Sequence, residues 1–211
     1  MKQEWVITIG REFCSGGAEI AHRLSEVLEI PYYDKNIIDH TAELLDLSTD
    51  VVREHDEKPA HFWDVSGYQY SNLWYSDDPS LLLPLSYRIA DAQFKLIRAA
   101  ATKGPCVIVG RCADYALKDR TNVLDVFIRA ELQARIGRAV RLYDIEESEA
   151  KKLIQKTDKI RKNYYENYTH RGWGDSSHYE MVLDSGRLGT EVIVQMIQNF
   201  VENTSPSVQP L

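Results

Sequence analysis

Hydrophobic and polar positions along this chain follow two different periods. Short and almost wholly apolar runs, such as residues 4–9 and 105–110, are typical of strands buried on both faces of a parallel sheet. The stretches between such runs repeat their apolar residues every three or four positions, as amphipathic helices do. This alternation predicts an α/β domain in which helices flank a parallel sheet. Strands are expected at residues 4–9, 32–33, 105–110, 122–128 and 181–184.

Helices are expected between these strands. The first follows a glycine-rich turn after the first strand, and Ile20, Leu24 and Val27 share one of its faces. Asp34 ends the second strand and stands at the N-cap position of the next helix. Further helices are predicted over residues 37–45, 51–56, 81–101, 131–143, 146–168 and 190–201.

The turn after the first strand carries the first candidate chemistry. Strand, glycine-rich turn and helix follow one another as in a phosphate-binding loop, where backbone N–H groups at a helix N-terminus bind an anion. The usual motif places Lys and then Ser or Thr after its last glycine, whereas Gly17 and Ala18 follow Gly16 here. We therefore predict a lysine-free phosphate cradle. It is formed by Gly10, Cys14, Ser15, Gly16, Gly17 and Ala18.

Other polar residues stand at the ends of predicted strands. In open parallel sheets, ligands bind beyond the carboxyl ends of the strands. Asp34, Arg111 and the pair Asp184-Ser185 all fall at such ends. Arg111 is a candidate for contact with a ligand phosphate, because Arg binds phosphate through two parallel N–H donors. The alternative is an ion pair between Arg111 and Asp114 or Asp34.

Length and composition narrow the class of protein. A chain of 211 residues suits one domain, and a net charge of −7 argues against a general nucleic-acid-binding surface. Three sparse cysteines without metal-ligand spacing indicate no disulfide framework and fit a reducing compartment. No stretch approaches the length of a membrane span, and the first apolar run is too short for a signal peptide. We therefore expect a cytoplasmic protein that binds neither nucleic acid nor a membrane.

Residues 59–82 differ from the rest of the chain, because aromatic residues lie there among Ser, Asp and Gly without a helical or strand period. One interpretation is a loop that packs against the body of the protein or in the interface of a homo-oligomer. The other is a flap with aromatic stacking surfaces at an acceptor site. The sequence leaves both interpretations open.

Five stretches together resemble one known family. They are Ile7 to Gly17, Tyr33 to Lys35, Val109 to Asp114, Thr157 to Arg161, and Leu183 to Gly189. The run Arg-Glu-Phe-Cys-Ser-Gly-Gly in the first stretch and Gly-Arg-Cys-Ala-Asp in the third are similar to motifs of the cytidylate kinase-like family of P-loop proteins. The similarity extends from about Trp5 to about Phe200, which is nearly the whole chain.

The resemblance implies a nucleoside monophosphate kinase-like fold with three layers. Such a fold has a five-stranded parallel sheet between helices, an acceptor-binding segment and a helical lid. On this chain the acceptor-binding segment would span about residues 35–85 and the lid about 131–177. The core of this single domain, 1–211, would comprise about residues 1–34, 86–130 and 178–203.

The resemblance also implies a reaction: transfer of a phosphoryl group from ATP, with Mg²⁺, to a small-molecule nucleotide, with CMP or dCMP as the default acceptor. Phosphoryl transfer depends on positioned cations and amides more than on a nucleophile or base. The predicted catalytic residues are Arg11, Arg135, Arg138 and Arg161, and the predicted acceptor-binding residues are Asp34, Arg111, Asp114 and Asp158.

Some of these residues have a local alternative. Asp158 and Arg161 are three positions apart on one predicted helix, where an ion pair between them is the other interpretation. Arg135, Arg138 and Arg141 fan around another helix, so one or two could face phosphates while at least one faces solvent.

The missing lysine leaves two functions open. In the first, Arg11 supplies the missing charge, Ser15 or Asp34 helps to hold Mg²⁺, and the protein is a kinase. In the second, the protein is a nucleotide- or phosphate-binding regulatory protein with a degenerate loop and without turnover. Cytosine specificity is also open, because cytidylate kinases read the pyrimidine with an Arg-Asp pair, whereas Cys112 follows Arg111 here.

Overall fold

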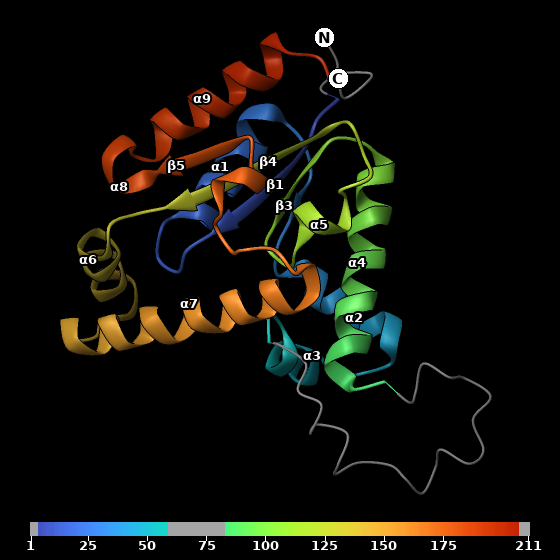
Figure 1. Cartoon of the computed structure of the whole chain (residues 1–211), viewed down its shortest axis with the longest axis horizontal. Coiled ribbons are helices and arrows are strands. Elements are labelled where there is room, and N and C mark those ends of the chain that lie inside the picture. Colours follow the sequence, from blue (N-terminus) through green and yellow to red (C-terminus); the bar gives the residue numbers. More distant parts are fainter. Residues whose placement is uncertain (1–3, 59–82, 207–211) are drawn as a thin grey trace, which may run out of the picture.

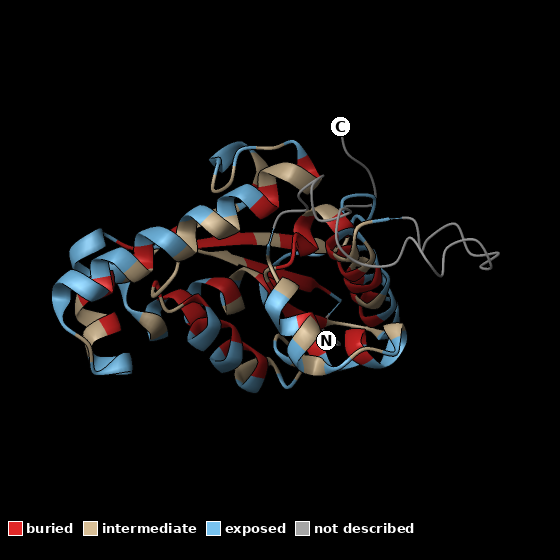
Figure 2. Cartoon of the chain, turned by 90° about the horizontal axis from the view of Figure 1, so that it is seen from below, coloured by how far each residue is buried: buried red, intermediate tan, exposed pale blue. Residues whose placement is uncertain are grey.

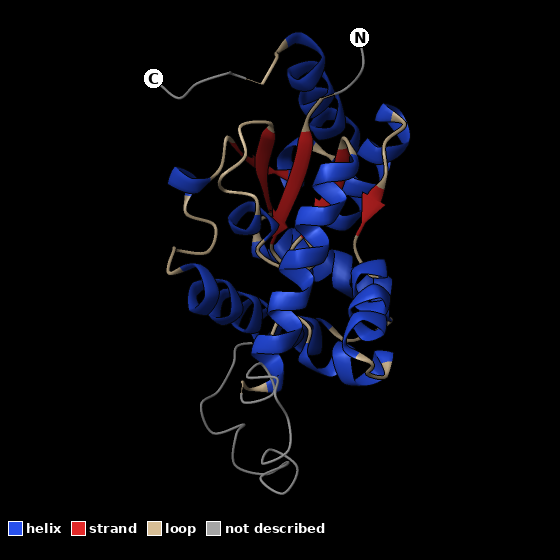
Figure 3. Cartoon of the chain, turned by 90° about the vertical axis from the view of Figure 1, so that its right-hand side faces the viewer, coloured by secondary structure: helices blue, strands red, loops and turns tan. Residues whose placement is uncertain are grey.

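The structure is a computed structural model of the chain and describes residues 4–58 and 83–206. The aromatic segment 59–82 therefore lies outside the described residues. A five-stranded sheet forms the centre of the described part, with strand order β2-β3-β1-β4-β5 and every neighbouring pair parallel. Helices surround the sheet (Figures 1 and 3). The predicted α/β class and five-stranded parallel sheet are confirmed.

The elements alternate along the chain as the sequence predicts. The strands are β1 (Val6–Arg11), β2 (Tyr32–Tyr33), β3 (Cys106–Val109), β4 (Val123–Arg129) and β5 (Met181–Asp184). The helices are α1 (Gly17–Leu28), α2 (Asn36–Leu45), α3 (Thr49–His55), α4 (Leu85–Lys103), α5 (Ala113–Ala116), α6 (Leu132–Tyr143), α7 (Glu147–Thr169), α8 (Ser185–Leu188) and α9 (Thr190–Asn203). No helix in the described ranges combines the length and apolar character needed to cross a membrane.

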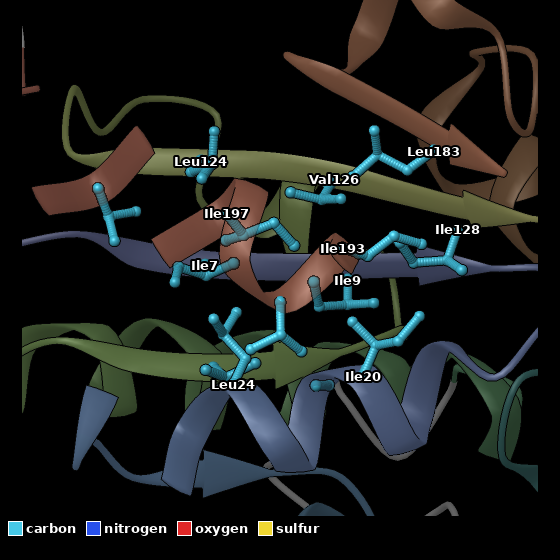
Figure 4. Close-up of a cluster of buried hydrophobic side chains, with 14 of the residues drawn as sticks. Ile7, Ile9, Ile20, Leu24, Leu124, Val126, Ile128, Leu183, Ile193 and Ile197 are labelled. Carbon is cyan, nitrogen blue, oxygen red and sulfur yellow. The ribbon is translucent and has the colours of Figure 1, made fainter. Parts of the chain in front are cut away.

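Two apolar clusters hold helices against the two faces of the sheet. On one face, Ile7 of β1 packs in a cluster with Leu24 of α1 and Ile193 of α9 (Figure 4). On the other face, Val6 belongs to a second cluster with Ile97 of α4. The helices turn buried sides toward the sheet and expose their opposite sides (Figure 2). Because both faces of β1 are covered, Val6, Ile7 and Ile9 are all apolar and buried, and the polar Thr8 among them donates its hydroxyl to Asp125.

Helix α4 begins at Leu85, although the sequence favoured a start at Leu81. Leu83 and Pro84 are described and lie outside the helix, with Pro84 in the N-cap position. The cause is Pro84, because the residue before a proline is disfavoured in the α-helical conformation. Proline at the boundary thus sets where the helix begins.

The predicted N-cap role of Asp34 is wrong. Lys35 occupies that position and makes no side-chain capping bond, while the Asp34 N–H donates to Asn36 Oδ1 at 2.9 Å. The Asp34 carboxylate instead accepts hydrogen bonds from the Tyr32 hydroxyl and the Arg111 guanidinium. A charged tertiary partner has replaced the local cap, because charge-assisted hydrogen bonds are stronger than neutral ones.

Helix α7 connects the α6 region to the core. Near its start, Ile154 packs in a cluster with Ile136 of α6. Near its end, Tyr164 and Tyr165 are buried in a cluster with Cys112, which follows β3. The second half of α7 is therefore anchored on the sheet domain, and the boundaries of a separate lid stay a prediction.

Candidate functional site

The glycine-rich turn closes into a compact loop between β1 and α1. Gly16 is the N-cap residue of α1 with a φ of 82°, and Cys14 has a φ of 58°. The Ser15 hydroxyl donates to the Glu12 carbonyl oxygen at 2.9 Å, and the Ser15 N–H donates to the same oxygen at 3.3 Å. Left-handed residues in such a turn bring successive N–H groups to one side, where they form an anion-binding concavity.

The loop leaves several backbone donors without a protein partner. Within the part of the chain that the structure describes, the N–H groups of Cys14, Gly16, Gly17 and Ala18 donate to no protein acceptor. The same four residues line a cleft of about 860 Å³. Unpaired N–H groups at a helix N-terminus form an anion site. The geometry therefore supports these four residues as the predicted phosphate cradle.

Close packing explains two of the glycines in the loop. A Cβ added to Gly10 would lie 2.8 Å from the Phe127 ring, and a Cβ added to Gly17 would lie 2.6 Å from the Arg11 Cβ. Gly17 stands where the usual loop carries its lysine, so the path of Arg11 leaves no room for a side chain there. Ser15, the remaining predicted cradle residue, is buried beneath the loop.

Arg138 brings a positive charge from α6 to this loop. A Cβ added to Gly16 would lie 3.0–3.3 Å from the Arg138 guanidinium, so a glycine permits this approach. Arg138 pairs with Glu19 of α1, but their side chains are 25% and 57% exposed. Exposed ion pairs hold their partners weakly. Arg138 lines the cleft beside the unpaired amides and is available to an anion bound there.

Glu57 joins two other predicted catalytic arginines. Arg11 Nη1 lies 2.6 Å from Glu57 Oε1, and Arg161 Nε lies 3.1 Å from Glu57 Oε2. Burial alone would raise the pKa of Glu57, but the charges of Arg11, Arg161 and Arg111 outweigh it and hold that pKa well below its ordinary value. Arg11 and Arg161 are thus held at one carboxylate at the edge of the cleft, and their catalytic roles stay predictions.

Arg111 is buried and engaged by two carboxylates. Its Nε and Nη2 donate to the two carboxylate oxygens of Asp56 at 2.9 and 2.7 Å, and its Nη1 donates to Asp34 Oδ1 at 3.3 Å. Burial alone would lower the pKa of Arg111, but Asp56, Glu57 and Asp34 outweigh burial and raise it. Of the ion pairs that the sequence left open, the one with Asp34 is formed, while Asp56 rather than Asp114 provides the second.

Asp158 and Arg135 meet behind the loop. Asp158 Oδ1 accepts from the Phe13 N–H at 2.7 Å, and Asp158 Oδ2 pairs with Arg135 Nη1. Arg135 Nε also lies 3.6 Å from Glu12 Oε2. Within the described ranges Asp158 forms no ion pair with Arg161, so the local pairing suggested by their spacing is wrong. Asp158 and Arg135 are brought together, but neither lines the cleft.

Asp114 lies in a buried network beneath the cleft. Its Oδ2 accepts from the Tyr165 hydroxyl at 2.6 Å, and burial raises the pKa of Asp114. Asp125 of β4 accepts from the Thr8 hydroxyl at 2.5 Å, and burial raises the pKa of Asp125 to about 7. A cavity of about 20 Å³ borders Asp114, which is room for a single water molecule. Asp114 thus anchors α7 through Tyr165 and does not line the larger cleft.

Asp56 and Glu57 are site residues that the sequence reasoning missed. Asp56 is the C-cap residue of α3, and Glu57 follows it with a left-handed φ of 51°. Nothing in their spacing marks them, because adjacent acidic residues after a short helix are usually solvated. The available signal was indirect: arginines buried at strand ends require carboxylate partners.

The loop fits a phosphate chain, but the protein supplies few ligands for a metal ion. The Ser15 hydroxyl is held on the Glu12 carbonyl and does not line the cleft, whereas Asp34 does. Among the residues that the structure covers, no group of three or more His, Cys, Asp or Glu side chains is arranged to hold a metal. Mg²⁺ commonly binds through one or two carboxylates together with substrate phosphates. The residues present therefore fit a Mg²⁺ ion that arrives with a nucleotide, with Asp34 as the candidate carboxylate.

Solved structures similar to this chain share its architecture. An uncharacterized protein from Eubacterium ventriosum has a TM-score of 0.70 and 28% sequence identity, over 95% of this chain and 100% of that chain. A shikimate kinase from Bacteroides thetaiotaomicron has a TM-score of 0.55 and 12% identity, over 94% of this chain and 98% of that chain. A shikimate kinase from Acinetobacter baumannii, in complex with shikimate, has a TM-score of 0.52 and 10% identity, over 95% and 94% of the two chains. At these identities the two kinases show the fold alone.

Sequence comparison gives the family. No curated protein matches the chain. The model of the cytidylate kinase-like family, however, matches residues 6–187, which include every strand and the glycine-rich loop. Together with the parallel sheet, this match shows that the chain belongs to the cytidylate kinase-like family and has the fold of P-loop kinases.

Proposed function

We propose that the protein transfers a phosphoryl group from ATP to a small-molecule acceptor. The observation that carries the proposal is the row of N–H groups at Cys14, Gly16, Gly17 and Ala18, which donate to no acceptor among the described residues and line the cleft beside Arg138. Backbone donors and a nearby guanidinium stabilise the charge that develops on the phosphate oxygens during phosphoryl transfer. Membership of a kinase-like family supports the same reaction.

In this proposal Arg138 takes the place of the usual lysine. It lies directly over Gly16, whereas Arg11, the residue suggested by the sequence, is engaged by Glu57 at 2.6 Å. The loop amides bind the phosphate chain, and the guanidinium of Arg138, which extends from α6, offsets the negative charge of the phosphates. Mg²⁺ bound with ATP would neutralise further phosphate charge, with Asp34 as the candidate protein ligand. Arg161 also lines the same cleft.

The second candidate function is that of a nucleotide-binding regulatory protein without turnover. Two observations favour it: no lysine follows Gly16, and both Arg11 and Arg161 are paired with Glu57. A loop with free amides would still bind a triphosphate in that case. The two functions therefore differ in turnover and not in nucleotide binding.

ADP formation separates the two functions. The purified protein is incubated with Mg²⁺, ATP and a panel of CMP, dCMP, other nucleoside monophosphates and uncharged hydroxyl compounds. A kinase gives acceptor-dependent ADP, and Arg138→Ala lowers kcat/KM about 100-fold, as expected for loss of one transition-state donor. The control is Arg141→Ala, an exposed arginine of the same helix, which leaves the rate unchanged. A rise in Tm with ATP but no turnover supports the regulatory function instead, and absence of ATP binding contradicts both.

A further inference from the structure

The cleft contains a second charged region, which we call the acceptor end. It holds as many carboxylates as guanidinium groups, and each of these side chains is at most 16% exposed. All of them line the cleft: Asp34, Asp56, Glu57, Arg11, Arg111 and Arg161. The acceptor end therefore carries no net formal charge.

Every guanidinium of the acceptor end is already committed to a carboxylate. Arg111 has both oxygens of Asp56 and one oxygen of Asp34 as acceptors. Glu57 stands between the other two arginines, and its two oxygens accept from both. A phosphomonoester group carries nearly two negative charges at neutral pH. Such a group would face three carboxylates, and the region has no net positive charge to offset it, because the extra guanidinium at Glu57 is matched by the extra carboxylate at Arg111.

Apart from Arg138 at the loop end, the described residues around the cleft offer little further positive charge. Lys35 and Arg53 line the rim of the cleft but are exposed, and Arg53 pairs with Asp50 at 2.7 Å. Lys58 is exposed and does not line the cleft. The sequence of residues 59–82 contains no Lys and no Arg. Wherever that segment lies, it cannot supply the guanidinium or ammonium group that a second phosphate requires.

We propose that the acceptor is an uncharged compound that presents a hydroxyl group, such as a nucleoside or a polyol, and not a phosphomonoester such as CMP. This inference rests on the proposed kinase function and concerns its substrate class. Carboxylates accept hydrogen bonds from hydroxyl groups, which the acceptor end can do with its unused lone pairs. It thereby selects for hydroxyl groups and against phosphate.

The corresponding transfer step is balanced by residues of this region. The acceptor oxygen forms a bond to the γ-phosphorus of ATP, the bond from that phosphorus to the β,γ-bridging oxygen breaks, and ADP leaves. The hydroxyl proton passes to Asp34, which in this step acts as proton acceptor and leaves Mg²⁺ to the ATP phosphates. Asp34 is the less engaged of the two carboxylates on Arg111, because its hydrogen bonds measure 3.1 and 3.3 Å against 2.7 and 2.9 Å for Asp56.

Matched pairs of acceptors test the inference. Cytidine and CMP, and ribose and ribose 5-phosphate, differ only by the phosphate group in question. Turnover is followed as ADP release with Mg²⁺ and ATP, and binding is measured by calorimetry on protein loaded with a non-hydrolysable ATP analogue. The uncharged member of at least one pair should bind and react at least about tenfold better than its phosphorylated counterpart.

A charge variant tests the cause of this selectivity. Asp56→Asn removes one negative charge and releases Arg111 for an incoming phosphate, so the preference should shift toward the phosphorylated member by about tenfold. Asp50→Asn is the matched control, because Asp50 lies on the same helix, is exposed and pairs only with Arg53 among the described residues. If Asp56→Asn does not fold, Asp34→Asn removes the longer of the Arg111 ion pairs. Because Asp34 is also the proposed proton acceptor, its preference is measured by calorimetric binding alone and should shift in the same direction.

The outcomes distinguish this inference from the proposed function. Better binding or faster turnover of the phosphorylated members overturns the inference while leaving the kinase function intact. So does a panel in which ATP binds but no uncharged hydroxyl compound does. Failure of ATP to raise the Tm of the protein contradicts the kinase function itself. A selectivity unchanged in both Asp56→Asn and Asp34→Asn refutes the assignment to these carboxylates.

Discussion

Arg138 and Arg111 lie in one cleft and are used in opposite ways. Arg138, beside the phosphate loop, is 25% exposed and pairs with Glu19, itself open to solvent. Arg111, at the acceptor end, is 3% exposed and is bound by Asp56 and Asp34. An exposed guanidinium exchanges its partner for an anion at little cost, whereas a buried one depends on its carboxylates to replace water. The comparison indicates that the partners of an arginine, and not its position at a strand end, decide how available its guanidinium is to a ligand.

Removing each arginine in turn gives the largest expected contrast. Arg111→Met leaves Asp56 and Asp34 buried without their cation and should lower the free energy of unfolding by about 3–5 kcal/mol. Arg138→Met should change it by less than about 1 kcal/mol, because its ion pair is exposed. Urea denaturation of the two variants beside the unmodified protein measures both values. Equal losses would contradict the division of the cleft into a ligand-binding arginine and a structural one.

Glu57, the carboxylate between Arg11 and Arg161, should stabilise the fold to a degree that depends on pH. Glu57→Gln leaves Arg11 and Arg161 without a counter-charge and should cost about 3 kcal/mol of unfolding free energy at pH 7. Because the folded protein lowers the pKa of Glu57, its stabilisation is present above the ordinary pKa of 4.5 and is lost as pH falls below that value. Urea denaturation between pH 7 and pH 3 should therefore show the gap between Glu57→Gln and the unmodified protein narrowing below pH 4.5. A gap that stays constant over this range argues against the buried ion pair.

A third change tests the packing of Gly17, in the loop, against Arg11, at the acceptor end. Gly17→Ala places a Cβ 2.6 Å from the Arg11 Cβ and should cost about 2 kcal/mol by overpacking. In an Arg11→Gly background the added Cβ has only an ordinary contact with the Ile128 Cβ at 3.5 Å, and the cost should fall below about 1 kcal/mol. The measurement is a double-mutant cycle in urea. Additive effects would show that Arg11 does not prevent a side chain, and hence a lysine, at position 17.

The smallest expected effect is at the partner of Arg138. Glu19→Gln removes the carboxylate that competes with a bound anion for this guanidinium. ATP should then bind about two- to threefold more tightly, in line with the weak energy of an exposed ion pair. Calorimetric titration with ATP in low salt measures the change. Weaker binding would mean that Glu19 holds Arg138 in its productive position.

Most of the sheet and its helices followed from local patterns. The apolar runs of β1 and β3 and the glycine-rich turn were visible because strands buried on both faces have few polar positions. The start of α4 was misplaced by four residues, from Leu81 to Leu85, although Pro84 carried the signal. The cap at Asp34 was misassigned for a different reason, because its true partner, Arg111, lies 77 positions away in the sequence.

The charged site was less predictable than the fold. The loop residues could be named from the sequence because the loop motif is local, and the structure places Arg138, from a distant helix, in the same cleft. Asp56 and Glu57 were missed, because they gain their importance only when α3 meets the ends of β1 and β3. The spacing of Asp158 and Arg161 suggested a local ion pair, but tertiary partners took both side chains.

By itself, the sequence determined the parallel α/β architecture, the family and the presence of a phosphate loop without its lysine. These features depend on local periodicity and on contiguous motifs. The tertiary structure decided how closely that position is packed, since a Cβ at Gly17 would lie 2.6 Å from the Arg11 Cβ. It also decided which arginine remains available to a phosphate, because burial and the placement of carboxylates depend on residues far apart in the chain. The sequence gives the position of each arginine, and the fold determines which carboxylates lie beside it.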